Sequence, residues 1–352
     1  MTGVLHLLVF TAVVPGRFIV NGMLSKLRVP ALLALIVGVA LIVVGILLPK
    51  MVSSDRPVPL ELESSTLMLV DPNATVGANY QGLDETESVQ APVARQFKIS
   101  LDQPADENEA SARVGVTTYR QDVKDDLEAL LDAQVFSYRV DRFTGEAVGG
   151  AGKVADTPVV PSNAVPMEGY WAKFPTNTEK QTYDYFDVTL RDALPAHFDR
   201  EETRTTNDGH DVPVYVFRQE IEPSSVKEQY EGIRNEITDP ESGEKAQLFH
   251  GGWREITVEP KSGLIVGVEE DVKDVYQIDG KEVDTLLQFH GRTDGHENQR
   301  MLEQARTIGH QRDIPKWRVA LIVAGAIVAA VSLFVVLRSG KRKVAAPKGR
   351  DE

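Results

Sequence analysis

The sequence predicts a mainly β domain that is held to a membrane by one apolar helix at each end. Residues 31–48 and residues 319–337 contain no charged side chain, and each run is about as long as a helix that crosses a hydrocarbon layer of about 30 Å. Between them, short segments rich in β-branched and aromatic residues alternate with turn residues, a pattern typical of strands and hairpins.

The N-terminal part contains two different segments. Residues 1–22 hold an apolar run that Pro15 and Gly16 interrupt, so this run is too short to span. Met23 begins a segment with the composition of a membrane-anchor start, and we expect translation to begin there. A cleaved signal peptide is the alternative for residues 31–48, but no small-x-small cleavage site follows Leu48, which favours an uncleaved anchor.

Basic residues flank both apolar runs on the sides that face the chain ends. Short basic flanks stay on the cytoplasmic side, so we expect a two-pass protein of the plasma membrane. The basic residues on which this orientation rests are Lys26, Arg28, Arg338, Lys341, Arg342 and Lys343. The expected organisation is an N-terminal extension (1–22), a cytoplasmic start (23–30), a first transmembrane helix (31–48), an extracytoplasmic β-rich domain (49–317), a second transmembrane helix (319–337) and a basic cytoplasmic tail (338–352).

The middle of the chain is strongly acidic. Residues 51–317 carry 27 Lys and Arg against 50 Asp and Glu, a net charge of −23. Such a surface repels nucleic acid, so we expect no nucleic-acid partner. The chain has no cysteine, so the domain must fold without disulfides and cannot use thiolate chemistry.

Strand-like segments and turns follow one another through this middle part. The loop-like composition of residues 71–92 separates the first expected strand from the rest. Two hairpins are expected, at Lys261-Ser262-Gly263 and at Asp279-Gly280. The expected strands are residues 60–70, 95–101, 112–119, 135–143, 183–190, 212–222, 253–259, 264–270, 274–278 and 283–291.

The expected strand at 212–222 is apolar on both faces. The valines at 212, 214 and 216 share one face, and Tyr215 and Phe217 share the other. This pattern indicates a strand that is covered on both sides or that lines an occupied interior. Helices are expected only at residues 123–131, 225–237 and 297–309, and the last has the clearest helical spacing of apolar residues.

No motif for catalysis or cofactor binding is found. The seven histidines show no metal-ligand spacing, so we expect no metal and no cofactor. Gly149-Gly150-Ala151-Gly152 lacks the context of a phosphate loop, and no G-x-S-x-G elbow is present. No catalytic residue can be named, although a pair of carboxylates for glycoside chemistry remains open among the many acidic residues.

Aromatic residues gather in one stretch, residues 167–187. One interpretation is a plain hydrophobic core. The other is an aromatic wall for an amphipathic ligand such as a lipid or a glycolipid. The residues of this candidate wall are Tyr170, Trp171, Phe174, Tyr183, Tyr185 and Phe186, with Tyr215 and Phe217 from the later strand.

The same stretch resembles a known family. Tyr170-Trp171-x-x-Phe174-Pro175, followed by Thr178-Glu179-Lys180-x-Thr182-Tyr183, is similar to a motif of the actinobacterial membrane-protein family named PorA. This family includes a lipoglycan-synthesis protein of mycobacteria and corynebacteria, and the resemblance extends over about residues 23–340. It implies an elongated, β-barrel-like ectodomain that encloses cavities, and a role in lipomannan and lipoarabinomannan assembly through a lipid-linked intermediate.

Three functions follow as hypotheses. The first is a non-enzymatic, membrane-anchored protein that binds a membrane lipid or lipid-linked glycan outside the cell membrane. The second is a carboxylate-dependent hydrolase or transferase acting on envelope glycans. The third is a scaffold for membrane glycosyltransferases, because the small residues Ala324-Gly325-Ala326 and Ala329-Ala330 allow another helix to approach closely.

Overall fold

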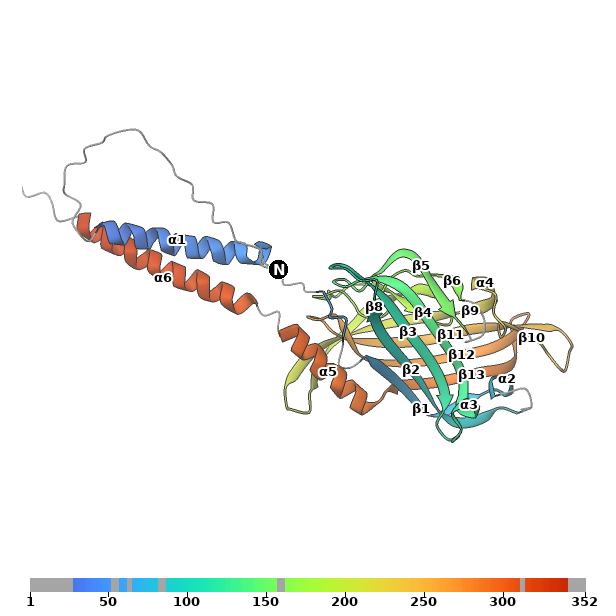
Figure 1. The fold of residues 1–352 in the computed structure, drawn as a ribbon. Helices are drawn as coiled ribbons and strands as arrows, with labels where there is room; N and C mark the ends of the chain where they lie inside the picture. The colour runs from blue at the N-terminus through green and yellow to red at the C-terminus, as the bar shows by residue number, and fades with distance from the viewer. Residues whose placement is uncertain are drawn as a thin grey trace, which may run out of the picture. The chain divides into compact units, whose positions relative to one another are not determined.

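The computed structural model describes residues 28–51, 57–61, 65–81, 87–156, 162–310 and 314–340. The chain forms two compact units, one made of Met1–Ser53 with Ile314–Glu352 and the other of Ser54–Asp313 (Figure 1). The expectations for residues 1–22, for Lys26 and for the basic residues at 341–343 lie outside the described residues. The units are described separately below.

The first unit is a pair of apolar helices. Helix α1 (Arg28–Met51) and helix α6 (Ile314–Gly340) contain the windows Pro30–Leu47 and Arg318–Leu337, which are long and apolar enough to cross a membrane. Only 17% and 11% of these windows are buried. Their side chains therefore mostly point outward, unlike those of a core helix in a soluble domain.

The two helices run antiparallel and touch through small residues. A Cβ atom added to Gly38 of α1 would lie 2.7 Å from the Ala329 backbone nitrogen, and one added to Gly45 would lie 2.8 Å from Cγ1 of Ile322. A Cβ atom on Gly325 would lie 2.7 Å from the Gly38 carbonyl oxygen. The small residues that the sequence offers for close helix approach are thus used within the chain, against α1.

This packing predicts a disulfide. Because the chain has no cysteine, Gly45→Cys with Ile322→Cys should form a single intramolecular disulfide on mild oxidation in membranes. The Cβ added at Gly45 lies 2.8 Å from Cγ1 of Ile322, the place that a cysteine sulfur would take, and this closeness brings the two cysteines within reach of a disulfide. The measurement is gel mobility with and without reductant. The control pair, Val44→Cys with Ile322→Cys, starts from a residue that is 49% exposed and should not cross-link. Equal cross-linking of both pairs would contradict the packing.

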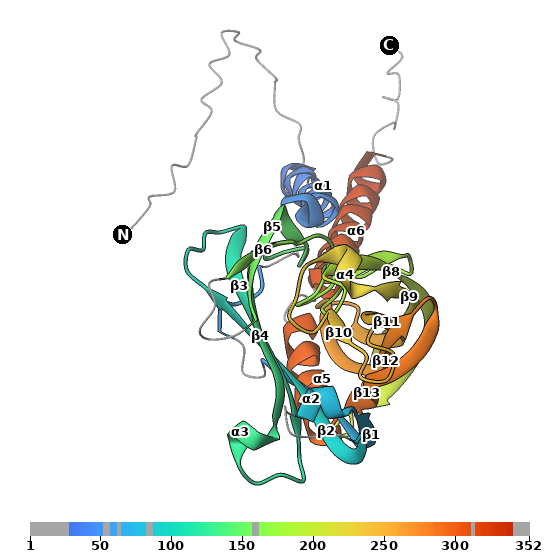
Figure 2. The same cartoon turned by 90° about the vertical axis from the view of Figure 1, so that its right-hand side faces the viewer.

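The second unit is one curved sheet of thirteen strands (Figure 2). Neighbouring strands follow the order β6-β5-β4-β3-β2-β1-β13-β12-β11-β9-β8-β7, β10 pairs with β11, and every pairing is antiparallel. The strands are β1 (Thr66–Val76), β2 (Val89–Asp102), β3 (Glu109–Arg120), β4 (Leu130–Asp141), β5 (Ala147–Ala155), β6 (Asn163–Pro166), β7 (Tyr183–Asp187), β8 (Asp192–Thr205), β9 (Asp211–Ser225), β10 (Glu236–Thr238), β11 (Lys245–Glu259), β12 (Leu264–Ile278) and β13 (Lys281–Thr293).

The mainly β class is confirmed, but the sheet ladder does not close into a barrel, because β6 and β7 remain its two ends. Single bridges connect the two end regions instead. Tyr170 forms an isolated bridge with Tyr185 of β7 and another with Glu146, which lies just before β5. The expectation of a barrel-like domain is therefore met only as a strongly curved sheet with bridged ends.

Helices are few in this unit, and two of the three expected ones are wrong in extent. Residues 123–131 and 225–237 each contain a single helical turn, because the flanking residues join strands β4, β9 and β10. Residues 71–92 also contain strand at both ends of the expected loop. The helices are α2 (Ala78–Gln81), α3 (Asp126–Ala129), α4 (Val226–Gln229) and α5 (Gly295–His310), the last as predicted.

Helix α5 explains the strand with two apolar faces. Val212 and Val214 of β9 pack in a small cluster with Leu302 and Ala305 of α5, while Phe217 on the opposite face belongs to the main core. The interpretation of 212–222 as a strand covered on both sides is confirmed. A hydrogen bond also connects α5 to β12, because the Asn298 side-chain amide donates to the Val266 carbonyl at 2.8 Å.

Candidate functional site

The aromatic residues singled out in the sequence lie together, mostly packed against one another. The Phe174 ring is fully buried, and its centroid lies 5.0 Å from that of Phe217, 5.2 Å from Tyr183 and 6.0 Å from Tyr185. Tyr170 stacks on Phe174 at 5.8 Å. Offset and edge-on contacts of this kind are typical of a well-packed core.

The remaining aromatic residues extend this core. Trp171 lies 5.1 Å from Phe136 and 5.0 Å from Phe186, and Tyr215 lies 5.6 Å from Phe198. Of the eight residues of the candidate wall, Trp171, Tyr185 and Phe186 line a pocket, and the other five contact mainly other rings.

The Phe174-Pro175 part of the motif is held in place by the turn between β11 and β12. The Phe174 backbone N–H donates to the Gly263 carbonyl at 2.7 Å, and the Thr178 N–H donates to the Pro260 carbonyl at 2.8 Å. Gly263 has φ +76°, and a Cβ atom there would lie 2.1 Å from the Phe174 carbonyl oxygen. Only glycine suits this conformation and this approach, so the turn and the motif depend on each other.

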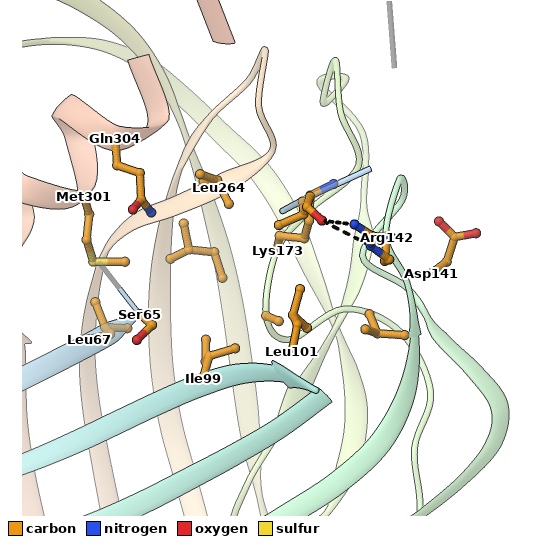
Figure 3. A pocket seen from close by; sticks show the side chains of 14 residues that line it. Ser65, Leu67, Ile99, Leu101, Asp141, Arg142, Lys173, Leu264, Met301 and Gln304 are labelled. Atoms are coloured by element: carbon orange, nitrogen blue, oxygen red, sulfur yellow. Dashed lines mark hydrogen bonds between the residues drawn. The ribbon is translucent and has the colours of Figure 1, made fainter. Parts of the chain in front are cut away.

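Two adjoining pockets lie on the inner face of the sheet, beside this core. The first contains about 660 Å³ of space, including its open part, and is lined by Val58, Ser65, Leu67, Ile99, Leu101, Val140, Asp141, Arg142, Ala172, Lys173, Leu264, Ile265, Met301 and Gln304 (Figure 3). The second contains about 530 Å³ on the same measure and is lined by Leu67, Phe97, Ile99, Val114, Trp171, Ala172, Tyr185, Phe186, Val188, Arg254, Ile265, Val268, Glu270 and Met301. The shared lining residues are Leu67, Ile99, Ala172, Ile265 and Met301.

Polar side chains at the first pocket are held by backbone carbonyl groups. Arg142 donates to the Val58 carbonyl from Nη2 at 2.9 Å and from Nε at 3.2 Å (Figure 3), and to the Asp106 carbonyl at 2.7 Å. Lys173 Nζ donates to the Phe143 carbonyl at 2.5 Å. These contacts fix the two basic groups at one side of the pocket, whereas apolar side chains supply most of the wall.

The lining of the second pocket includes a buried pair of opposite charges. Arg254 and Glu270 are neighbours across β11 and β12, and Arg254 Nε donates to Glu270 Oε2 at 2.8 Å. Arg95 of β2 donates to the other oxygen of Glu270 at 2.7 Å. Arg254 also donates from Nη1 to Gln219 Oε1 at 2.8 Å and from Nη2 to Asp187 Oδ2 at 3.1 Å.

The charge network continues through a histidine. His250 Nε2 lies 3.4 Å from Asp187 Oδ2, and His250 Nδ1 lies 2.5 Å from Asp274 Oδ1. The order is therefore Arg95, Glu270, Arg254, Asp187, His250, Asp274, with positive and negative groups alternating. We call these six residues the buried charge network, and each is at most 5% exposed.

Neighbouring charges keep His250, Glu270 and Asp187 ionised. Burial by itself would lower the pKa of His250, but Asp187 and Asp274 outweigh it and raise this pKa to about 10. Burial would raise the pKa of Glu270 and of Asp187, yet the positive groups beside each carboxylate lower both values. These carboxylates are thus unsuited to act as general acids, a role that needs a raised pKa.

The raised pKa of His250 predicts a pH-dependent stability. Its ordinary pKa of 6.5 applies when the chain is unfolded and its pKa of about 10 when it is folded, so its stabilisation is complete below about pH 6.5 and is lost as the pH rises towards 10. The unfolding temperature of the full chain in detergent, followed by tryptophan fluorescence, should fall over this range. His250→Gln cannot take up the proton and should show a smaller fall; an equal fall would argue against a charged His250.

Sequence reasoning missed this network, although one signal was present. Arg254 has the same strand parity as Ile256 and Val258, and Glu270 the same parity as Val268 and Val272. A charged residue in phase with a buried apolar face must find a buried partner. Within the described ranges, no group of three His, Cys, Asp or Glu is placed to hold a metal ion.

Comparison with known proteins places the chain in a family. The family model described as "Porin PorA" matches residues 30–334. The chain is also 25% identical over 316 residues to a protein named "Porin PorA" from Corynebacterium amycolatum, and the match covers 73% of this chain and 80% of that protein.

Proposed function

This chain belongs to the PorA family of membrane proteins, and from that premise we propose that its β domain binds the apolar part of a membrane lipid or lipid-linked glycan. In this proposal α1 and α6 cross the plasma membrane, both chain ends are cytoplasmic, and the β domain works outside the membrane in lipoglycan assembly. The observation that carries the proposal is the pair of adjoining, mainly apolar pockets on the inner face of the sheet.

The pockets suit a flexible apolar chain. Among the side chains that line both pockets, Leu67, Ile99 and Ile265 are aliphatic. Burial of one methylene group contributes about 0.8 kcal/mol, so burial of about ten methylene groups of one acyl chain matches the free energy of micromolar binding. No charged contact with the ligand is required.

Residues near the two apolar helices in the sequence line the first pocket. Val58 follows α1 in the chain, and Met301 and Gln304 belong to α5, which precedes α6. Val58 is 3% exposed, and its carbonyl accepts from Arg142. In our proposal the pocket exchanges its ligand with the membrane to which the domain is tethered.

The outer face of the sheet does not resemble a lipid-facing surface. Arg200 of β8 pairs with Glu202 and with Glu255 of β11 in contacts of 2.7 and 2.8 Å, all partly exposed. Strands that cross a membrane carry an apolar outer face. This supports a β domain that lies in water while the two helices supply the attachment.

A pocket-filling substitution tests the proposal. Ala172 lines both pockets, so Ala172→Phe should place a ring in the space that the ligand needs. Full-length protein purified from its native membrane should retain lipid that native mass spectrometry detects, and the variant should lose most of it. The control Ala151→Phe, at an exposed position of β5, should retain it. Equal lipid content in all three proteins, or none in the wild type, would argue against the proposal.

The two other hypotheses receive less support. A glycan hydrolase or transferase would need a carboxylate pair in a polar cleft, whereas Glu270 lines a mostly apolar pocket and its pKa is lowered. A scaffold would use the small residues of α6, but Gly325 already contacts α1. Glycosyltransferases remain as partners in our proposal, reached through the ligand that they share with this domain.

A further inference from the structure

The wall of the second pocket includes one ion pair, whose charges cancel. Among its fourteen lining residues, Arg254 and Glu270 are the two charged ones, and their side chains are 5% and 0% exposed. Apolar and aromatic side chains, among them Ile265 and Trp171, make up most of the wall. A ligand that fills the pocket therefore meets hydrocarbon along its length and an ion pair at one point.

The ion pair belongs to the buried charge network, which holds three positive and three negative groups. Arg95, Arg254 and His250 balance Glu270, Asp187 and Asp274. Each oxygen of Glu270 already accepts from a guanidinium group. The network as a whole is neutral, unlike an anion-binding site, where positive groups stand in excess.

The charge of a ligand group therefore determines whether it can bind beside the Arg254–Glu270 pair. A phosphate or carboxylate placed beside Arg254 would also lie near Glu270 and Asp187, and it would bring an unbalanced negative charge against buried side chains. An uncharged oxygen brings no such cost. A guanidinium carries five N–H groups, and the contacts within the described ranges engage each nitrogen of Arg254 once, so a hydroxyl or ester oxygen can still accept from it.

We propose that the second pocket selects the uncharged polar end of a lipid, a hydroxyl or an ester, and rejects a phosphate or carboxylate at the same place. This inference rests on the proposed function and adds the ligand class. A lipid-linked glycan would then insert its ester-linked or free-hydroxyl portion and leave any phosphate outside the pocket.

Tryptophan quenching by a matched ligand pair tests this selection. The chain has three tryptophans, so Trp253→Phe with Trp317→Phe leaves Trp171, which lines the second pocket, as the single reporter in the full chain. Brominated monoacylglycerol and brominated lysophosphatidic acid share the acyl chain and the glycerol and differ by one phosphate. In neutral detergent, the monoacylglycerol should quench Trp171 at a concentration at least about tenfold lower, a difference of about 1.4 kcal/mol.

The reversal of the preference is the second part of the test. Glu270→Gln keeps the shape and leaves the network with one excess positive charge, so lysophosphatidic acid should gain at least about tenfold relative to the neutral lipid. Equal or tighter binding of the anionic lipid to the unsubstituted network would overturn this inference and leave the proposed function standing. Quenching by neither lipid would overturn both. Ala172→Phe should abolish the quenching by both lipids, which ties the signal to the pocket.

Discussion

Arg254→Met should lower the free energy of unfolding by about 3–5 kcal/mol, because it leaves Glu270 and Asp187 buried with fewer positive partners. Arg254 donates to three different side chains, and the cost of a buried, unpaired charge is much larger than the net worth of the pair itself. For a domain of this size the unfolding temperature should fall by roughly 10 °C. The measurement is thermal unfolding of the full chain in detergent, followed by tryptophan fluorescence.

A charge-matched double variant is the control for this prediction. Arg254→Met combined with Glu270→Met removes one positive and one negative group, so the remaining four members of the network are again balanced. We expect the double variant to be more stable than Arg254→Met alone. A double variant less stable than the single one would show that charge balance is not what Arg254 provides.

Phe174→Ala should have the second large effect, also about 3–5 kcal/mol. The ring is fully buried, and it contacts Tyr170, Tyr183, Tyr185 and Phe217, so its removal leaves a cavity that the surrounding rings cannot close. Phe143→Ala, at a half-buried position, is the matched control and should cost much less. The measurement is again the unfolding temperature.

Phe174→Ala also tests whether Phe174 belongs to the hydrophobic core or to the wall of the ligand site. Phe174 lines neither pocket, whereas Ala172 lines both. Phe174→Ala should therefore destabilise the domain without removing the bound lipid from the molecules that remain folded, and Ala172→Phe should remove the lipid at small cost in stability, since it fills existing space. If Phe174→Ala removes the lipid while the fold stays stable, the ring belongs to the ligand site.

The sequence predicted the two apolar helices, helix α5 and the strand at 212–222, because hydrophobic periodicity among adjacent residues marks each of them. The spans at 31–48 and 319–337 appear as the apolar helices α1 and α6, and the helical spacing at 297–309 appears as α5. The two apolar faces of the strand at 212–222 follow from period-two alternation, and the structure shows a cover on each face. In each case the signal lies within a few adjacent residues.

The charged strand β8 (Asp192–Thr205) could not be predicted in this way. Its second half is rich in Arg and Glu and mostly exposed, so no alternation of apolar residues marks it. It forms because its backbone pairs with β9 and because Arg200 holds Glu202 and Glu255 on the outer face. The β9 backbone and Glu255 become neighbours of β8 only in the folded sheet.

The candidate site was predictable in part. The aromatic stretch was visible in the sequence, but the assignment of Trp171, Tyr185 and Phe186 to a pocket and of Phe174 to the core depends on side-chain packing. The hairpin turn at 261–263 by itself would place Arg254 opposite Glu269, and an irregularity between Thr257 and Val258 shifts the register so that Arg254 lies opposite Glu270. The sequence does not mark this shift, so the pairing could not be predicted from the turn. Arg95 and Asp187 come from distant strands, and nothing local in the sequence connects them to the pair.

An experimental density map of the full chain, purified from its native membrane, tests the central claim most directly. We predict continuous, chain-like density through the two pockets, in contact with Ile99, Ala172 and Ile265, with any phosphate outside the reach of the Arg254–Glu270 pair. Pockets that hold only ordered water, or that are closed by their own side chains, would contradict the account.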